Sequence, residues 1–333
     1  MDALLTDADD VFRRFSEMRI KHPHHEAAVA TFEKLRRRKV SAPHAEQTAA
    51  SLFAGSRSGK TTTVNWYIEK VLVDEWLKLK PEKIDLPRSV LARIQTLGLY
   101  VELGGSTTMN GLMSDFLIAL GCVDPFAGTA KERKYRVEKI LSSEGYQIIF
   151  LDETQHIKTQ THTGSISRQD DASEVQNTVK NWVKRWPIIF VGTQHAENVV
   201  FEHQVNTRSD TPIKFGPLHF SIDNDKKIFT EFCGRLSLKV AQHRILEEPP
   251  KILVDGDVPL CLNISSKGRL GLVTVLVRMG IELAVSKGEK TLRREHLEAA
   301  VNDFSLRIGI CNYNPFLAGP TIIPSVEEYA RDE

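Results

Sequence analysis

The chain has 333 residues, of which 41% are hydrophobic and 26% charged, and 44 Lys plus Arg nearly balance 43 Asp plus Glu. Such a composition is that of an ordinary globular protein, and the length suggests about two domains. The balanced charge excludes attraction of nucleic acid by the field of the whole molecule, so DNA binding would need local patches. The four cysteines are scattered without a C-x-x-C pair, which argues against a disulfide scaffold or zinc site. No apolar run reaches the roughly 18 residues of a membrane helix, so we expect a cytoplasmic protein with no membrane partner.

Residues 1–46 show apolar residues at helical spacing, such as Val11, Phe15 and Met18, which predicts a small helical N-terminal extension. The run His22-Pro23-His24-His25 offers three histidines without further ligands, a pattern more typical of surface residues than of a metal site. The basic run 36–39 and a second one at 131–134 are either solvated faces or contacts to DNA phosphates.

Residues 47–222 alternate strand-like and helical runs, which predicts a parallel sheet covered by helices on both faces. The strand-like runs are Ala49–Phe53, Gly98–Leu103, Gln147–Leu151, Pro187–Gly192 and Phe215–Phe220. The polar, Ser/Thr-rich segment 158–173 is expected to be a long loop. Thr107 and Thr108 follow two glycines, and we expect them to cap the next helix or to present its N-terminus to a phosphate.

The segment Ala54–Thr62 follows the first strand-like run and leads into a helical stretch, the order of a phosphate loop. In such a loop backbone N–H groups and the helix N-terminus bind phosphate oxygens. Lys60 is predicted to reach the β- and γ-phosphates, and the Thr61 hydroxyl to bind Mg²⁺. The sequence therefore predicts an ATP site with Mg²⁺, built from Gly55, Ser56, Arg57, Ser58, Gly59, Lys60, Thr61 and Thr62.

Two carboxylates, Asp152 and Glu153, end the apolar run at 147–151. A strand that delivers acids to the phosphate end of a sheet predicts that Asp152 holds Mg²⁺ through water and that Glu153 polarises the attacking water. Thr193 ends the next apolar run and either senses the γ-phosphate or, like Gln194, caps the helix that begins near His195.

Two arginines farther along the chain are candidates for the same site. Arg208 precedes the last strand-like run and is either a finger that enters a neighbouring subunit's site or a surface arginine paired with Asp210. Arg269 opens the helix marked by Leu270 and Val273, and it either reaches the γ-phosphate or is a solvated first-turn residue.

Helical spacing from residue 223 to residue 310 predicts a helical lid, and ATP is expected between the sheet domain and this lid. The irregular tail 311–333 is expected either to bind a partner as a peptide hook or to pack on its own lid.

These motifs, in this order, resemble an AAA+ ATPase of the initiator-like group, and more specifically the TnsC/TniB family of transposition ATPases. The resemblance covers roughly residues 15 to 310. It rests on His22-Pro23, Ser58–Thr62, Tyr100-Val101-Glu102, Gly111-Leu112, Leu120-Gly121, Asp152-Glu153-Thr154-Gln155-His156, Val191-Gly192-Thr193 and Gly268-Arg269-Leu270-Gly271. Arg57 departs from the family, which often has Gly there, and the loop after His156 is longer than expected.

The resemblance implies a P-loop AAA+ fold and an ATP-dependent regulator that forms a homo-oligomeric ring or filament on double-stranded DNA. It also implies that the protein links a TniQ-like targeting protein to the transposase subunits and resets by hydrolysis. Three other functions stay open: a loader of replication proteins from the same superfamily, a stand-alone P-loop phosphotransferase, and an adaptor that binds ATP without hydrolysing it.

Overall fold

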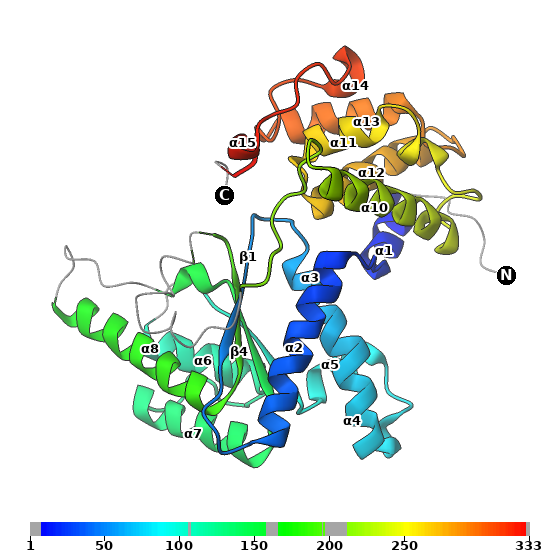
Figure 1. The fold of residues 1–333 in the computed structure, drawn as a ribbon. Helices are drawn as coiled ribbons and strands as arrows, with labels where there is room; N and C mark the ends of the chain where they lie inside the picture. Colours follow the sequence, from blue (N-terminus) through cyan, green and yellow to red (C-terminus); the bar gives the residue numbers. More distant parts are fainter. Residues whose placement is uncertain (1–7, 106–107, 158–165, 195, 197–211, 331–333) are drawn as a thin grey trace. The chain divides into compact units, whose positions relative to one another are not determined.

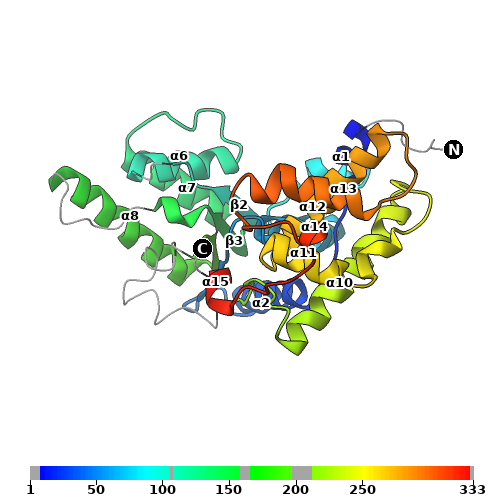
Figure 2. The ribbon, with the colours of Figure 1, turned by 90° about the horizontal axis from the view of Figure 1, so that it is seen from above.

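The computed structural model describes residues 8–105, 108–157, 166–194, 196 and 212–330, and for 166–173 and 330 the backbone alone. Its contacts divide the chain into two compact units. We call His24–Ala54 with Lys60–Phe215 the sheet unit, and Met1–Pro23, Gly55–Gly59 and Gly216–Glu333 the helical unit. Figures 1 and 2 show the elements of both units from two directions. The four predicted sequence ranges of extension, core, lid and tail stay a prediction.

The sheet unit is built on four parallel strands in the order β1-β4-β3-β2. Their bounds are Ala49–Phe53 (β1), Gly98–Glu102 (β2), Ile148–Asp152 (β3) and Ile188–Gly192 (β4). Each strand agrees to within one residue with an apolar run in the sequence. The crossed order brings the carboxyl ends of β1, β4 and β3 side by side, since neighbouring parallel strands end at the same edge.

Successive strand residues enter two different cores, as expected for a sheet that is buried on both faces. On β3, Ile149 and Leu151 join one core, whereas Ile148 and Phe150 join the other. The helices of this unit are α2 (Pro23–Ser41), α3 (Lys60–Tyr67), α4 (Val73–Leu79), α5 (Arg88–Ile94), α6 (Met109–Ala119), α7 (Ala130–Ser143) and α8 (Ile166–Arg185). A π-helical turn, Ile68–Leu72, joins α3 to α4. The predicted parallel sheet with helices on both faces is confirmed.

Two predictions for this unit are wrong. Residues 215–220, all of which the structure describes, do not form a strand; Ile213 donates one backbone bond to Ser51 of β1 (2.9 Å), and Pro217 has no N–H to continue such a ladder. The segment 166–173, expected to be loop, is the first part of α8. Its Arg168, Gln169 and Ala172 are good helix formers, so its polar composition is compatible with a helix. Residues 158–165 lie outside the described residues.

The helical unit buries one core formed mainly by α1, α10, α11 and α12. Its helices are α1 (Ala8–Glu17), α10 (Asp223–Gln242), α11 (Val258–Ser266), α12 (Leu270–Ser286), α13 (Arg294–Ala300), α14 (Pro315–Ala318) and α15 (Val326–Ala330), with a π-helical turn at Val301–Leu306. On α12, Val273, Val277 and Ile281 are fully buried on one face, as the helical spacing predicted for this region requires. Among the residues that the structure describes, no helix is both long and apolar enough to cross a membrane.

The C-terminal tail packs on the helical unit. The Tyr329 ring is buried and lies 4.9 Å from the His219 ring, and its hydroxyl donates to Asn263 Oδ1 (2.8 Å). His219 Nε2 is bonded to the carbonyl of Pro324 (2.7 Å). Of the two alternatives for the tail, the described part therefore shows packing on its own unit.

Candidate nucleotide-binding site

The phosphate loop follows β1, and its residues Gly55–Gly59 belong to the helical unit by their contacts. Arg57 and Gly59 both have positive φ, 60° and 102°, in the region that glycine adopts most easily. Ser58 donates its backbone N–H to the Gly55 carbonyl (3.3 Å), which closes a tight turn. The Ser58 hydroxyl is buried and has no hydrogen-bond partner in the described part of the chain. A buried polar atom of this kind in the loop is consistent with a polar ligand such as phosphate.

Two neighbours of Arg57 within the helical unit explain its conformation. The Arg57 guanidinium lies 4.8 Å from the centre of the Phe304 ring, a cation–π contact. The first turn of α12 touches the loop backbone, because a Cβ added to Gly271 would lie only 2.1 Å from the Arg57 carbonyl oxygen. Gly271 is therefore required for this close approach. The departure of Arg57 from the usual Gly places a cation against an aromatic ring of the same unit.

Lys60 is the first residue of α3, at the helix N-terminus where anions are favoured. Its side chain is buried, and Nζ donates to the carbonyl of Ala54 at the start of the loop (2.6 Å). Thr61 and Thr62 follow with exposed side chains. The ammonium therefore lies at the residue that follows β1.

Asp152 ends β3 and is the most connected carboxylate of the sheet edge. One oxygen, Oδ2, accepts hydrogen bonds from the hydroxyls of Thr61 and Tyr100, each 2.8 Å long. The other, Oδ1, accepts the N–H of Glu153 (2.8 Å). Burial raises the pKa of Tyr100, and the Asp152 charge raises it further, so the Tyr100 hydroxyl keeps its proton and donates it in the hydrogen bond to Asp152. The predicted pair of Thr61 and Asp152 is thus brought together.

Glu153 follows directly in the left-handed region, with φ of 58°, an unfavourable conformation for a residue with a side chain. It begins a 3-10 turn, Thr154–His156. Its carboxylate accepts a hydrogen bond from the Gln155 amide, and its Oε2 lies 3.9 Å from His156 Nε2. The Glu153 side chain remains 43% exposed, so water reaches it.

Thr193 follows β4 at the same edge of the sheet. Its N–H donates to Gln155 Oε1 (3.3 Å), and its carbonyl accepts the N–H of Ala196 (2.9 Å). Both bonds involve the Thr193 backbone and not its hydroxyl. The roles of Thr193 as γ-phosphate sensor or helix cap therefore stay predictions. His195 lies outside the described residues, as do Arg208 and Asp210, so the finger prediction is untested.

Arg269 belongs to the helical unit and immediately precedes α12. Its side chain is buried, which overturns the alternative of a solvated first-turn arginine. Gly271, two residues later, is the residue that touches the Arg57 carbonyl. Its predicted reach to the γ-phosphate stays a prediction.

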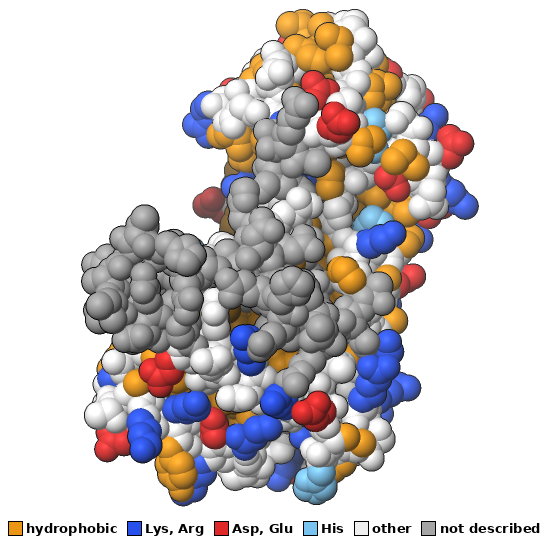
Figure 3. Space-filling view, turned by 60° about the vertical axis from the view of Figure 1, so that its left-hand side comes forward, with side chains coloured by type: hydrophobic (Ala, Val, Ile, Leu, Met, Phe, Trp, Pro, Cys, Tyr) orange, Lys and Arg blue, Asp and Glu red, His pale blue; other side chains and the backbone are white. Residues whose placement is uncertain are grey.

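The basic runs are largely engaged within the protein. Arg36 is buried in ion pairs with Glu33 and Glu75, which removes it as a DNA contact, whereas Arg37 is exposed. Arg133 donates to the carbonyl of Gly128 and to the hydroxyl of Ser114, so it braces the loop before α7. On the face drawn in Figure 3, Lys and Arg side chains are spread over the sheet unit with Asp and Glu between them.

The three histidines near residue 23 pack against aromatic rings. His25 is bonded through Nδ1 to the Thr63 hydroxyl (3.2 Å) and lies edge-on to Trp66, and His24 lies near Phe215. His22, in the helical unit, lies edge-on to Phe232. Thr108 accepts the N–H of Gly111 and caps α6, which confirms the capping alternative for that residue; Thr107 lies outside the described residues.

Sequence reasoning assigned no role to Tyr100 and Gln155, which the structure places in the site. Both stand in motifs that carried the family resemblance, Tyr100-Val101-Glu102 and Asp152–His156. Their positions in the sequence could have indicated a role, since Tyr100 lies in strand β2 and Gln155 follows the end of strand β3.

The hydroxyl and carboxylate oxygens of Thr61 and Asp152 are the ligands that Mg²⁺ prefers, so these residues fit that ion.

One family model matches part of the chain. Residues 44–200 match the family model described as an AAA domain. No curated protein matches the sequence. The matched stretch carries the phosphate loop, Asp152 and Thr193, and it is similar to an AAA domain.

Three archaeal structures resemble the fold. The ORC1 protein of Aeropyrum pernix, solved in complex with DNA, is 18% identical with a TM-score of 0.56, over 91% of this chain and 71% of that chain. The ORC2 protein of the same organism, in its ADP form, is 14% identical with a TM-score of 0.58, over 90% and 73%. Cdc6p of Pyrobaculum aerophilum is 13% identical with a TM-score of 0.53, over 90% and 72%. At these identities the likeness shows the fold, which is that of AAA+ P-loop proteins.

Proposed function

We propose that this protein is an ATPase that assembles as a ring or helical filament on double-stranded DNA and regulates transposition. In this proposal it links a TniQ-like targeting protein to the transposase, and hydrolysis loosens the assembly. The observation that carries the ATPase is the 2.8 Å hydrogen bond between Thr61 and Asp152, which joins the helix of the phosphate loop to the end of β3. The link to transposition rests on the resemblance of the segment 152–156 to TnsC/TniB proteins.

In the proposed mechanism the loop and Lys60 bind the ATP phosphates, and Glu153 accepts a proton from the attacking water. Thr61 and Asp152 would hold Mg²⁺, which neutralises charge on the phosphates when it is bound. Glu153 suits its role because its carboxylate is half-exposed and oriented by a hydrogen bond. A carboxylate placed to accept water's proton favours hydrolysis over transfer to another acceptor.

Thr193, Arg208 and Arg269 are proposed to respond to the γ-phosphate. Support for Arg269 comes from its burial and from the contact of Gly271 with the Arg57 carbonyl, which brings the start of α12 to the phosphate loop within one unit. Arg208 is proposed as the arginine finger that a neighbouring copy supplies, because it follows Thr193 and the helix expected near His195 in the sequence. Nucleotide would then act as a link between subunits, so ATP binding and assembly would be coupled.

The test is light scattering and negative-stain imaging with double-stranded DNA, with and without a non-hydrolysable ATP analogue. We expect rings or filaments that need both DNA and nucleotide and that are lost in Lys60→Ala. A monomer under every condition would contradict the proposal and favour the stand-alone phosphotransferase.

A second candidate, a loader of replication proteins, is favoured by the fold shared with the archaeal ORC and Cdc6 structures, one of them solved on DNA. It predicts the same nucleotide-dependent binding to DNA but a different client. Purified transposase would be stimulated under the first proposal. Under the second, a replicative helicase or clamp would be loaded and the transposase would be unaffected.

A further inference from the structure

Gln155 lies between two groups of the candidate site and is bonded to both. Its Nε2 donates to Glu153 Oε2, and its Oε1 accepts the N–H of Thr193 (3.3 Å). A glutamine amide has one donor end and one acceptor end, so these two partners fix its orientation. The reversed amide would place its oxygen against the Glu153 carboxylate and its NH₂ against the Thr193 N–H. Gln155 therefore connects the end of β3 to the end of β4 in one arrangement.

The surrounding backbone is built around this side chain. Thr154 donates its hydroxyl to the carbonyl of Val191 (2.8 Å), which ties the same turn to β4. A Cβ added to Gly192 would lie 2.7 Å from Thr154 Oγ1 and 2.8 Å from Gln155 Oε1, so this position leaves room for both side chains because it has none. Two side-chain bonds and one glycine thus hold the turn after Glu153 against the end of β4.

The chemistry of the bond to Glu153 suits a base that must be oriented and stay charged. The neutral Gln155 amide donates a hydrogen bond to the carboxylate without adding a positive charge beside it. A lysine or arginine in its place would form a stronger, charged pair with the carboxylate. The bond occupies Oε2, and the side chain keeps access to water. Because the Glu153 side chain is 43% exposed, packing alone does not fix one direction for it. An external hydrogen bond supplies that direction.

We propose that Gln155 is a positioning residue that orients the Glu153 carboxylate and couples it to the backbone of Thr193. The role in hydrolysis rests on the proposed ATPase function. A shift of Thr193 changes the position of the Gln155 amide and, through it, of the carboxylate. A contact between Thr193 and a γ-phosphate would thereby shift the Glu153 carboxylate through two hydrogen bonds, one from Thr193 to Gln155 and one from Gln155 to Glu153.

Two variants separate the two bonds. Gln155→Met keeps the shape and removes both bonds, whereas Gln155→Glu keeps an acceptor for the Thr193 N–H but replaces the donor to Glu153 by a second carboxylate. We expect kcat for ATP to fall about 10- to 100-fold in both, with the larger loss in Gln155→Glu, because the base is misplaced or repelled. KM for ATP should change less than about 2-fold, since neither bond contacts the loop that binds phosphate.

The matched control is Gln95→Met. Gln95 is a buried glutamine that donates to the Gly98 carbonyl and accepts the N–H groups of Leu97 and Gly98 at the start of β2. Its loss should lower stability and leave kcat per folded molecule unchanged. If Gln155→Met also keeps wild-type kcat while wild-type turnover requires Lys60, the positioning role is overturned and the ATPase function stands.

A second readout does not depend on turnover. In protein labelled with ¹⁵N-threonine, the Thr193 amide proton should move upfield in Gln155→Met, and it should also move in Glu153→Gln, which touches Thr193 through Gln155. The exposed Glu174→Gln should leave it unmoved. An unmoved Thr193 resonance in both site variants would overturn the coupling. Wild-type protein without Lys60-dependent turnover would overturn the proposed function, and the Thr193 resonance would then decide the coupling alone.

Discussion

Two polar clusters lie at opposite ends of strand β3, and they are built from the same residue types for different purposes. At the carboxyl end, Asp152 is joined to Thr61 and Tyr100. Before the amino end, Gln147 accepts a hydrogen bond from Arg36 (2.7 Å). Both clusters combine a carboxylate, a tyrosine and a glutamine with groups from neighbouring helices.

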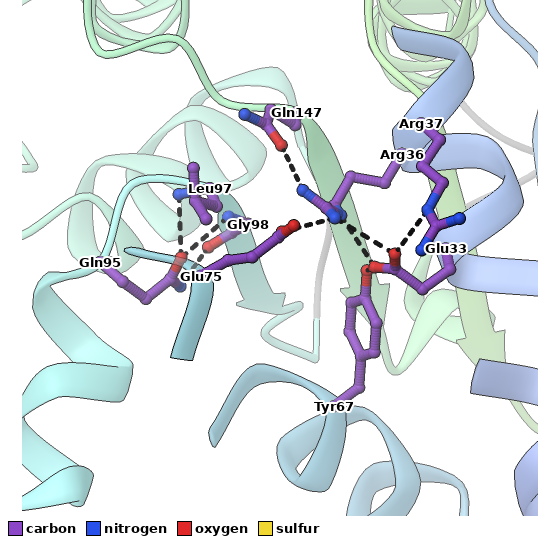
Figure 4. Close-up of polar contacts among 9 residues, drawn as sticks. All are labelled: Glu33, Arg36, Arg37, Tyr67, Glu75, Gln95, Leu97, Gly98 and Gln147. Atoms are coloured by element: carbon purple, nitrogen blue, oxygen red, sulfur yellow. Dashed lines mark hydrogen bonds and ion pairs between the residues drawn. The ribbon is translucent and has the colours of Figure 1, made fainter. Parts of the chain in front are cut away.

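The cluster at the amino end, drawn in Figure 4, is closed on itself. Arg36 donates to Glu33 through Nε (2.8 Å) and pairs with Glu75 (2.5 Å), and the Tyr67 hydroxyl donates to Glu33. Burial would raise the pKa of Glu33, but hydrogen bonds from Arg36, Tyr67 and Arg37 hold it below its ordinary value. Every member thus has partners within the protein, as a structural network requires.

The cluster at the carboxyl end is open on one side. Thr61 is exposed and the Glu153 side chain is 43% exposed, although the Asp152 carboxylate between them is buried. Glu75 of the closed cluster is 41% exposed, about as much as Glu153, but it pairs with Arg36. The difference teaches that charged partners, not residue type, separate a structural network from a candidate site. The following predictions test this separation, from the largest expected effect to the smallest.

Lys60→Ala should lower ATP turnover about 10²- to 10³-fold, because the ammonium stabilises charge on the transferred phosphoryl group. Its stability should change little by comparison. Steady-state phosphate release measures the effect, and Lys70→Ala, at an exposed lysine of the π-helical turn, is the control. Equal turnover in the two variants would place the chemistry elsewhere.

Arg36→Met should affect stability rather than turnover. We expect it to lower the free energy of unfolding by about 3–5 kcal/mol, because Glu33 and Glu75 lose the arginine that pairs with their charges. Turnover per folded molecule should stay at the wild-type level. Urea denaturation measures the stability, and Arg37→Met, at a side chain that is 77% exposed, should cost less than about 0.5 kcal/mol. A small effect of Arg36→Met would show that the amino-end cluster does not support the fold.

Tyr100→Phe tests a residue of the open cluster that supports Asp152 from β2. Loss of its 2.8 Å bond should raise the Mg²⁺ concentration needed for half-maximal turnover about 10-fold, because the carboxylate loses an orienting partner. Stability should fall by only about 0.5–1.5 kcal/mol. A Mg²⁺ titration of turnover measures the first effect, and an unchanged midpoint would assign Tyr100 a packing role.

Acid should weaken the closed cluster through Glu33. Because its folded pKa lies below the ordinary 4.5, its contribution to stability is present above pH 4.5 and is lost as pH falls through the folded pKa. The difference in unfolding free energy between wild type and Glu33→Gln should therefore shrink as the solution is acidified below that value. A difference independent of pH would mean that the Glu33 charge is not what Arg36 binds.

The open cluster could be predicted from the sequence to a large extent, because its residues follow apolar strands whose ends must meet at one edge. The phosphate loop, Asp152 and Thr193 are predicted in this way. Tyr100 and Gln155 were not given roles, since a side chain's partner across two strands depends on register and rotamer. Their roles, like those of the other site residues, are proposals.

The closed cluster could not be predicted, because Arg36 stands in a run of four basic residues that has the pattern of a solvated face. Its burial depends on Glu75 and Gln147, which are distant in sequence. The strand prediction at 215–220 is wrong for a related reason. Apolar residues there are buried, but in the described part of this segment the backbone bond to the sheet is the one from Ile213 to Ser51. Apolar patterning predicts burial more securely than it predicts pairing.

The most direct test of the account is ATP binding and phosphate release measured together for wild type and Glu153→Gln. The account predicts that the variant binds ATP with wild-type affinity while its turnover falls about 10²- to 10⁴-fold, since it loses the base but keeps the phosphate loop. Wild-type turnover in Glu153→Gln, with ATP still bound, would contradict the claim that the carboxyl end of β3 carries the chemistry.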